Sequence, residues 1–396
     1  MDAARATGNR IAELDAVRGL AAVCVVLGHL TLALVAVGTA SRSNGLTPWN
    51  VLLYSPLHVL FDGGAAVIVF FVLSGFVLAV SYESGRQTYG GFLVRRVARI
   101  WIPYAVAVAG AMLLATVIAD NAIPGTSGWF TAPWRDAVGV VPLLQHVSLI
   151  GHYGNDAEYL PVIWSLTDEM RISIVFPVLI AAVAAFGWRR SVVASVVLTA
   201  IGLALSRKVS ADFATLEYVL CFVAGIVLAA HRRTLVERLR SWSRRDRQLL
   251  FAVALLLFTW ESWYPPAWAP GPLSSVVHSE GVHVVFETAG AAAFIVLAQV
   301  PGPVHDLLLR RLPQYLGRIS YSLYLVHTTV LLAVGHLLGG HVALAWLLAP
   351  VFLVSIAVAD LMQRTVERPA QRLGRRWAGR VESGARRPPV PAVASS

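Results

Sequence analysis

The chain alternates between long apolar runs and short segments rich in charge, proline and glycine, and this alternation predicts its helices. Runs of roughly 20 apolar residues suffice, at about 1.5 Å of rise per residue, to cross a hydrocarbon core of about 30 Å. We therefore predict an all-α, polytopic integral membrane protein with about ten transmembrane helices. The expected helices cover residues 14–36, 62–82, 101–119, 162–182, 191–206, 212–230, 248–264, 282–300, 315–338 and 342–363.

Composition also indicates a lipid environment. Of 396 residues, 57% are hydrophobic and 14% are charged, whereas soluble domains carry about 25% charged residues. The two cysteines, Cys24 and Cys221, lie inside apolar runs, which excludes a disulfide framework. The first twenty residues hold acidic side chains and no short apolar core, so we expect no cleaved signal peptide.

The distribution of Lys and Arg predicts the orientation, because cytoplasmic loops hold most of these residues. With the N-terminus inside, the cytoplasmic segments hold 26 of the 32 basic residues and the opposite side holds 4, while Arg18 and Arg171 lie within predicted helices. Both termini are then cytoplasmic, and the net charge of +10 needs no nucleic-acid partner. We expect one membrane-embedded domain over 1–380 and a disordered cytoplasmic tail over 381–396.

The first predicted helix carries two side chains that are costly at membrane depth. Arg18 and His29 are 11 residues apart, which returns them to nearly the same helix face about 16 Å apart along the axis. A histidine near the midplane suits a general base, with the arginine holding an anionic group nearer the cytoplasm. The alternative is that Arg18 extends to the interface and His29 bonds a neighbouring helix.

The second predicted helix contains a small pair, Ser74 and Gly75, within FFVLSGFVLAVSY (70–82). Small residues in a membrane more often permit close helix packing than supply a nucleophile. We favour packing and keep Ser74 as a candidate substrate-positioning residue.

An arginine cluster marks the cytoplasmic start of the third predicted helix. In RRVARIWIPY, Arg96 and Arg99 share one helix face, which suits bidentate binding of phosphate, and Arg95 adjoins them. Lipid headgroups are the alternative ligand.

The fourth predicted helix opens with WSLTDEMRISIVFP (164–177), which places carboxylates where a span is ordinarily apolar. Glu169 either orients His29 or an acceptor hydroxyl, or pairs with Arg171 or another buried arginine. Further candidates for positioning a substrate are Trp164, Ser165 and Asp168.

A polar stripe follows in LGRISYSLYLVHTTV (316–330), where Tyr321, Tyr324 and His327 recur at three-residue intervals on one helix face. Hydrogen bonding between helices and a role in a site are both consistent with it.

These blocks together resemble the acyltransferase-3 membrane proteins, bacterial enzymes that O-acylate sugars, glycans, lipids and some antibiotics. The arginine-x10-histidine spacing of Arg18 and His29 is similar to the family signature. FFVLSGF, RRVARIWIPY, WSLTDEMRISIVFP and SYSLYLVH follow in order, with ERPAQRL at 367–373 near the end. The family often has Phe-Tyr after the glutamate, whereas Met170 and Arg171 follow Glu169 here. This departure bears on the class of acceptor more than on the type of reaction.

The resemblance implies a ten-helix enzyme that takes an acyl group, acetyl or short-chain, from cytoplasmic acyl-CoA to an acceptor hydroxyl. His29 would be the catalytic histidine, with Arg18 and Glu169 as partners, and Arg96 and Arg99 would match the pair associated with coenzyme A phosphates. The expected partners are acyl-CoA, a carbohydrate or glycosylated acceptor and the lipid bilayer of a bacterial cytoplasmic membrane, with a homo-oligomer left open. No permanently bound cofactor is expected.

Two other readings remain at this point. A transporter or flippase of a lipid-linked sugar would line its pathway with the same buried polar groups, although we detect no internal repeat. A purely structural scaffold leaves those groups unexplained. We expect no metal site, because no histidine and carboxylate cluster has ligand-like spacing.

Overall fold

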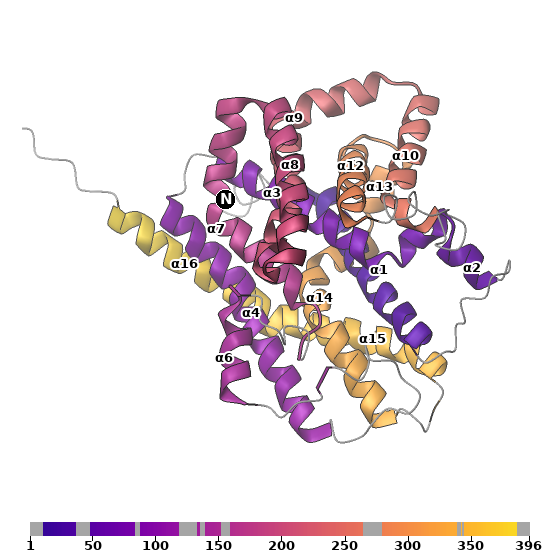
Figure 1. Cartoon of the computed structure of the whole chain (residues 1–396), viewed down its shortest axis with the longest axis vertical. Helices are drawn as coiled ribbons and strands as arrows, with labels where there is room; N and C mark the ends of the chain where they lie inside the picture. Colours follow the sequence, from indigo (N-terminus) through magenta and orange to yellow (C-terminus); the bar gives the residue numbers. More distant parts are fainter. Residues whose placement is uncertain are drawn as a thin grey trace, which may run out of the picture.

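The computed structural model describes residues 11–36, 48–83, 88–118, 133–134, 139–151, 159–263, 279–338, 342 and 344–385. Regular structure in these residues is helical, which confirms the predicted class (Figure 1). The long helices are α1 (Ala12–Ala36), α3 (Gly63–Glu83), α4 (Tyr89–Ile118), α7 (Ile163–Phe186), α8 (Trp188–Lys208), α9 (Val219–Ser241), α10 (Arg244–Phe258), α12 (Glu280–Ala298), α14 (Arg311–Leu338), α15 (Leu344–Met362) and α16 (Arg368–Ala385). Shorter elements are α2 (Pro48–Leu53), α6 (Val140–Ser148), α13 (Pro303–Leu308), the 3-10 helices η1 (Pro56–Leu60), η2 (Ala211–Tyr218) and η3 (Trp260–Trp263), and the π-helical turn η4 (Gln363–Glu367).

Nine helical segments among the described residues are long and apolar enough to cross a membrane. The tenth expected span, 248–264, corresponds to α10, which has 15 residues and gives way to η3. At about 1.5 Å per residue it reaches about 22 Å, short of a hydrocarbon core of about 30 Å. The chain is thus a polytopic helical membrane protein with nine such segments in its described part.

Helices α1 and α14 pack closely against each other at the centre of the fold (Figure 1). Gly19 and Gly317 meet there with their backbones in contact, because a side-chain carbon on either would collide with the backbone of the other helix. Small residues allow this approach in membranes, where interhelical packing stabilises the fold. The crossing sets Arg18 and His29 of α1 beside the stripe of α14.

A second close crossing joins α3 to α9. A side-chain carbon on Gly75 would collide with the backbone of Phe222, and one on Gly225 would collide with Val72. The packing role favoured for the small pair thus holds for Gly75. Ser74, one position earlier, lies on a different face of α3 and reaches the interior described below.

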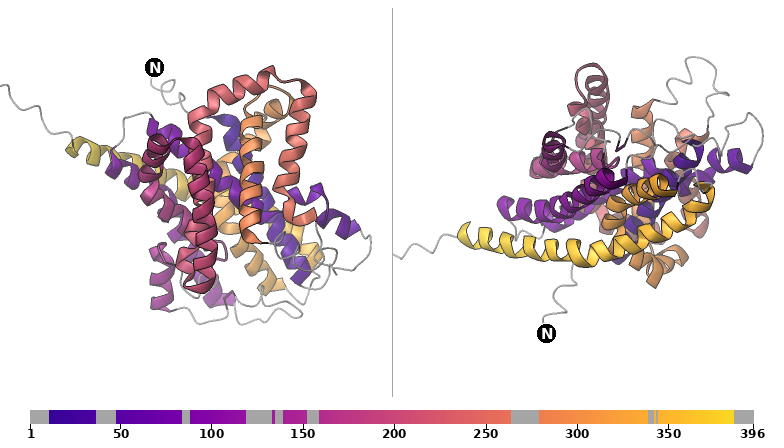
Figure 2. Two further views of the ribbon diagram at one scale, coloured as in Figure 1. Left: turned by 45° about the horizontal axis from the view of Figure 1, so that its top comes forward. Right: turned by 90° about the horizontal axis from the view of Figure 1, so that it is seen from below.

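Helix α4 begins at Tyr89, twelve residues before the start expected at 101. Pro103 therefore lies inside the helix and not in its first turns. The arginine cluster is therefore part of a continuous helix and partly faces the protein interior. Helix α16 runs alongside α4, and the turn η4 joins α15 and α16 into one long bent rod (Figure 2). Helix α16 continues to Ala385, so the first five residues of the tail expected at 381–396 are helical, and the others lie outside the described residues.

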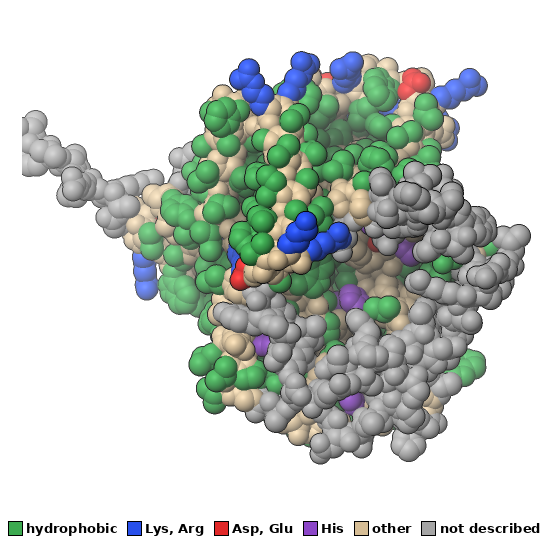
Figure 3. Space-filling view, viewed as in Figure 1, with side chains coloured by type: hydrophobic (Ala, Val, Ile, Leu, Met, Phe, Trp, Pro, Cys, Tyr) green, Lys and Arg blue, Asp and Glu red, His purple; other side chains and the backbone are tan. Residues whose placement is uncertain are grey.

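The surface agrees with a helical bundle in lipid. Figure 3 shows hydrophobic side chains over most of the described part of this face, with Lys and Arg gathered along the edge where α9 ends and α10 begins. Many large apolar side chains are exposed, including Val117 at 72% and Trp346 at 79%. This arrangement matches a lipid-facing belt bordered by basic residues.

We predict that Gly317→Ala lowers the stability of the protein. The added methyl group collides with the carbonyl of Asp15, which no side-chain rotation relieves, and such overpacking costs about 1–3 kcal/mol. The measurement is the thermal unfolding midpoint of purified protein in detergent. Gly110→Ala is the matched control, because a carbon there meets no atom within 4 Å. Equal midpoints for the two variants would contradict the close crossing.

Candidate active site

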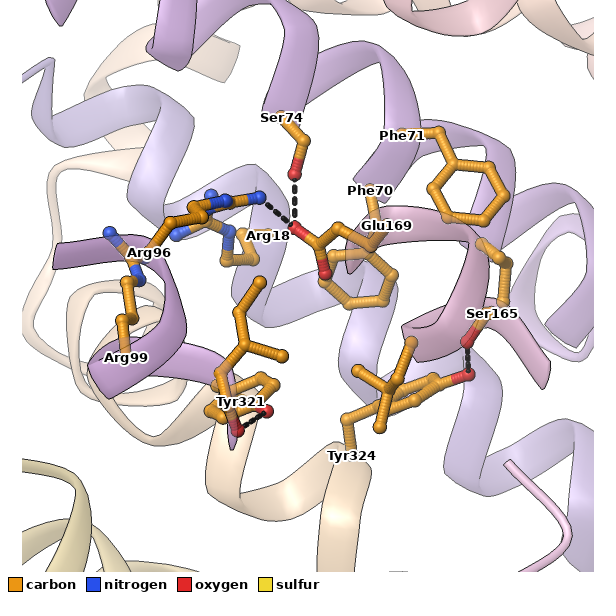
Figure 4. Close-up of a pocket in the computed structure, with 13 residues that line it drawn as sticks. Arg18, Phe70, Phe71, Ser74, Arg96, Arg99, Ser165, Glu169, Tyr321 and Tyr324 are labelled. Carbon is orange, nitrogen blue, oxygen red and sulfur yellow. Dashed lines mark hydrogen bonds and ion pairs between the residues drawn. The ribbon is translucent and has the colours of Figure 1, made fainter. Parts of the chain in front are cut away.

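A small inner cavity of about 50 Å³ lies where five helices converge (Figure 4). Its walls combine the aromatic rings of Phe70 and Phe71 with charged and hydroxyl groups. The polar lining residues are Arg18 from α1, Ser74 from α3, Arg96 and Arg99 from α4, Ser165 and Glu169 from α7, and Tyr321 and Tyr324 from α14. Positions far apart in the sequence thus meet in one cavity.

Glu169 is the electrostatic centre of this cavity. Its carboxylate accepts hydrogen bonds from the Ser74 hydroxyl at 2.6 Å and from the Arg96 guanidinium at 2.5 Å (Figure 4). Arg96 also donates through Nε to the Ser173 hydroxyl at 2.9 Å. Of the alternatives for Glu169, pairing with a buried arginine holds, and the partner is Arg96 and not Arg171. A paired carboxylate avoids the high cost of an isolated buried charge.

A larger cavity of about 480 Å³, here called the vestibule, adjoins the inner cavity. Arg18, Arg99 and Tyr321 line both cavities and so mark the neck between them. The vestibule is bounded by the beginnings of α1, α14 and α16, by η4 and by the last turns of α3, which is the side expected to face the cytoplasm. A molecule entering from that side would pass the neck to reach Glu169.

His29 lies at the interface of α1 and α14 and is only partly exposed. Its Nδ1 lies 3.0 Å from the Val25 carbonyl oxygen and 3.3 Å from Nε2 of the fully buried His327. Nδ1 of His327 lies 2.9 Å from the Tyr324 carbonyl and 3.1 Å from that of Leu323.

These contacts determine where the protons lie in the neutral imidazoles. Carbonyl oxygens only accept hydrogen bonds, so each Nδ1 carries its proton and donates it. The Nδ1 proton of His29 is then shared between the Val25 carbonyl and Nε2 of His327, which accepts, and Nε2 of neutral His29 holds a lone pair. A lone pair fixed in this way is what a general base requires. His29 does not line the inner cavity, and Tyr324 and His327, with ring centroids 6.0 Å apart, lie between them.

The tyrosines of the α14 stripe bond to neighbouring helices and also line the inner cavity. Tyr321 donates to the Ile100 carbonyl of α4 at 2.7 Å, and the Tyr324 hydroxyl lies 2.6 Å from that of Ser165 in α7. Both tyrosines also line the inner cavity. Bonding between helices thus fixes the same groups that face the cavity.

Besides His29 and His327, three predicted site residues lie outside both cavities. Arg95 forms an ion pair with Glu382 of α16 at 2.6 Å. Asp168 accepts from Thr215 of η2 at 2.6 Å, and the Trp164 ring packs on Tyr218 with centroids 5.7 Å apart. These residues fasten α4 and α7 to neighbouring elements.

Two polar residues near the cavities, Ser173 and Glu367, were not predicted as site residues from the sequence. Ser173 supports Arg96, and Glu367, which is 4% exposed, lines the vestibule and accepts from Ser322 at 2.7 Å and Gln371 at 3.0 Å. The only sequence signal for Glu367 is its place in the ERPAQRL stretch. Among the described residues, His, Cys, Asp and Glu form no group of three or more that would hold a metal ion.

Comparison with known proteins identifies the family. A family model described as an acyltransferase domain matches residues 11–364, nearly the whole chain. The chain belongs to the acyltransferase-3 family. It is an acyltransferase with multiple membrane-spanning helices, so an acyl donor and an acceptor are its substrates. The resemblance carried by the sequence motifs is thereby confirmed.

Two curated relatives match over most of their length. Acyltransferase MdmB of Streptomyces mycarofaciens is 28% identical over 352 residues, which cover 81% of this chain and 84% of that protein. O-acetyltransferase PaAT-1 of Phomopsis amygdali is 24% identical over 376 residues, which cover 82% of this chain and 73% of that protein. No solved structure matches the chain significantly.

We predict that Arg96→Met destabilises the protein by about 3–5 kcal/mol, because it leaves the Glu169 carboxylate buried without its cation. The double variant Arg96→Met with Glu169→Gln removes both charges and should recover part of that loss. Chemical unfolding of the purified variants measures the difference. If the losses of the two single variants simply add in the double variant, the buried pair is not energetically coupled.

Proposed function

We propose that this protein is an O-acyltransferase that moves an acetyl or other short acyl group from cytoplasmic acyl-CoA to a hydroxyl of a sugar, glycan, glycolipid or glycosylated natural product. The observation that carries the proposal is the histidine pair: His29, with its Nε2 lone pair fixed through His327, is separated by His327 and Tyr324 from an inner cavity that adjoins an arginine-lined vestibule. Acyl-CoA is a substrate in this proposal and not a resident cofactor.

The donor would enter through the vestibule with its thioester leading. Arg18 and Arg99 line the neck, where their charge attracts an anionic ligand from the expected cytoplasmic side. The slender pantetheine arm suits the narrow inner cavity, whose apolar wall includes Val67, Phe70 and Leu166. The phosphorylated end then remains in the vestibule.

The chemistry needs one base and one positioned thioester. His29 Nε2 takes the proton of the acceptor hydroxyl. At the same time the oxygen of that hydroxyl forms a bond to the thioester carbonyl carbon. The carbon–sulfur bond then breaks, and the leaving thiolate takes the proton from the His29 imidazolium, which restores the neutral base. Glu169, Tyr321 and Tyr324 orient the reactants at the inner cavity, and Ser165 fixes the Tyr324 hydroxyl.

The relatives support a hydroxyl acceptor. The name of the Phomopsis relative specifies O-acetyl transfer, and that of the Streptomyces relative specifies acyl transfer. Membership of the family favours transfer over the transporter or flippase considered from sequence. We extend the proposal to carbohydrate modification at the cytoplasmic membrane of a bacterium, in which the nine apolar segments would lie.

The decisive test is His29→Ala in membranes supplied with acyl-CoA labelled in the acyl group. Without the base, transfer of label to extractable acceptors should fall by about 10²–10⁴-fold. His231→Ala is the matched control, since His231 is exposed and makes the same bond to a carbonyl four residues earlier. Transfer by His29→Ala at the rate of the control would overturn the assignment of the base.

His327 should act as a positioning residue. His327→Leu removes the nitrogen that accepts from His29, a loss of about 1–2 kcal/mol of orientation that lowers kcat by about 5- to 30-fold. The KM of this variant for acyl-CoA should equal that of the wild type, because His327 lies outside both cavities. His327→Gln keeps an accepting oxygen and should recover part of kcat. A rise in KM with kcat unchanged would assign His327 to donor binding instead.

A further inference from the structure

The arginines near the site fall into two groups. Some are neutralised by nearby acids: Arg95 by Glu382, Arg96 by Glu169 and Arg171 by Asp212. Others line the vestibule and form no hydrogen bond or ion pair with any residue that the structure describes. This second group consists of Arg18, Arg99, Arg318 and Arg368. Four arginines against the two carboxylates of the vestibule wall leave an excess of positive charge around a cavity large enough for a ligand.

These four arginines lie at two depths. Arg18 and Arg99 are partly buried and also line the inner cavity, which places them at the neck. Arg318 and Arg368 are exposed and line only the vestibule, so they lie at its mouth. The guanidinium of Arg318 stacks over the Tyr315 ring at 5.6 Å, which restricts its orientation.

The π-helical turn η4 holds Arg368 at this mouth. Glu367, the last residue of the turn, is 4% exposed and accepts from Ser322 of α14 at 2.7 Å and from Gln371 of α16 at 3.0 Å. These bonds tie the start of α16 to α14, the helix that carries Arg318. Such turns are rare and often occur at functional sites, and this one directs Gln363, Glu367 and Arg368 to the vestibule wall.

We propose that Arg318 and Arg368 bind the phosphate groups at the nucleotide end of the acyl-CoA donor. The inference rests on the proposed function and assigns to its donor site two residues that lie far from the RRVAR cluster in the sequence. Guanidinium groups bind phosphate through paired, charge-assisted hydrogen bonds, and unpaired ones lose no internal partner when they do so. Of the sequence candidates Arg95, Arg96 and Arg99, the first two would have to leave Glu382 and Glu169 to bind phosphate.

The test measures binding of coenzyme A, and separately of pantetheine, to the purified full-length protein in lipid nanodiscs. The double variant R318Q/R368Q should weaken coenzyme A binding about tenfold or more. Its binding of pantetheine, which lacks phosphate, should match that of the wild type. R311Q/R372Q is the control, with the same charge change at exposed positions on the same two helices and outside both cavities.

The outcomes separate this inference from the proposed function. If both double variants bind coenzyme A as tightly as the wild type does, the phosphate assignment is wrong and the proposed function stands. Equal weakening of coenzyme A and pantetheine by R318Q/R368Q would also overturn the assignment, since it indicates a general distortion of the vestibule. If the wild type binds neither ligand, the acyl-CoA donor is wrong and both proposals fail.

Discussion

The backbone contact between Gly19 of α1 and Gly317 of α14 is the constraint on which the site depends. His29 lies ten residues after Gly19, and His327 lies ten residues after Gly317. Ten residues advance a helix by about 15 Å, so the two histidines reach the same level and meet at 3.3 Å. The proton arrangement that suits His29 to act as a base therefore follows from two glycines placed about three turns away.

The pairing of charges changes from the vestibule to the inner cavity. At the inner cavity Glu169 and Arg96 neutralise each other, as a region of low dielectric requires. At the neck and mouth the arginines of the vestibule form no ion pair or hydrogen bond with a described residue. An anionic ligand would thus first meet arginines that form no ion pair among the described residues, at the mouth and the neck, and beyond them the ion-paired Glu169 and Arg96. This arrangement fits a donor that is phosphorylated at one end and reactive at the other.

Interhelical bonding and cavity lining coincide in residues for which the sequence left a structural role and a site role as alternatives. Tyr321 and Tyr324 bond to neighbouring helices and line the cavity through the same side chains. In the small pair the roles divide, since Gly75 packs against α9 while Ser74 donates to Glu169. In a membrane this overlap is expected, because a polar group that lines a site also needs a partner within the protein.

The sequence by itself determined the helical membrane class, most of the spans and the family, because hydropathy and motif spacing are local properties of the chain. It also singled out Arg18, Ser74, Arg96, Arg99, Ser165, Glu169, Tyr321 and Tyr324, which line the inner cavity. Only the tertiary structure decided which charges are paired. Arg95 and Arg96 are adjacent in sequence, yet one turns to Glu382 and the other to Glu169, because α4 packs between α16 and α7. The sequence likewise did not predict the vestibule site of Arg318 and Arg368. These two arginines are 50 residues apart and line the same cavity only because η4 packs against α14.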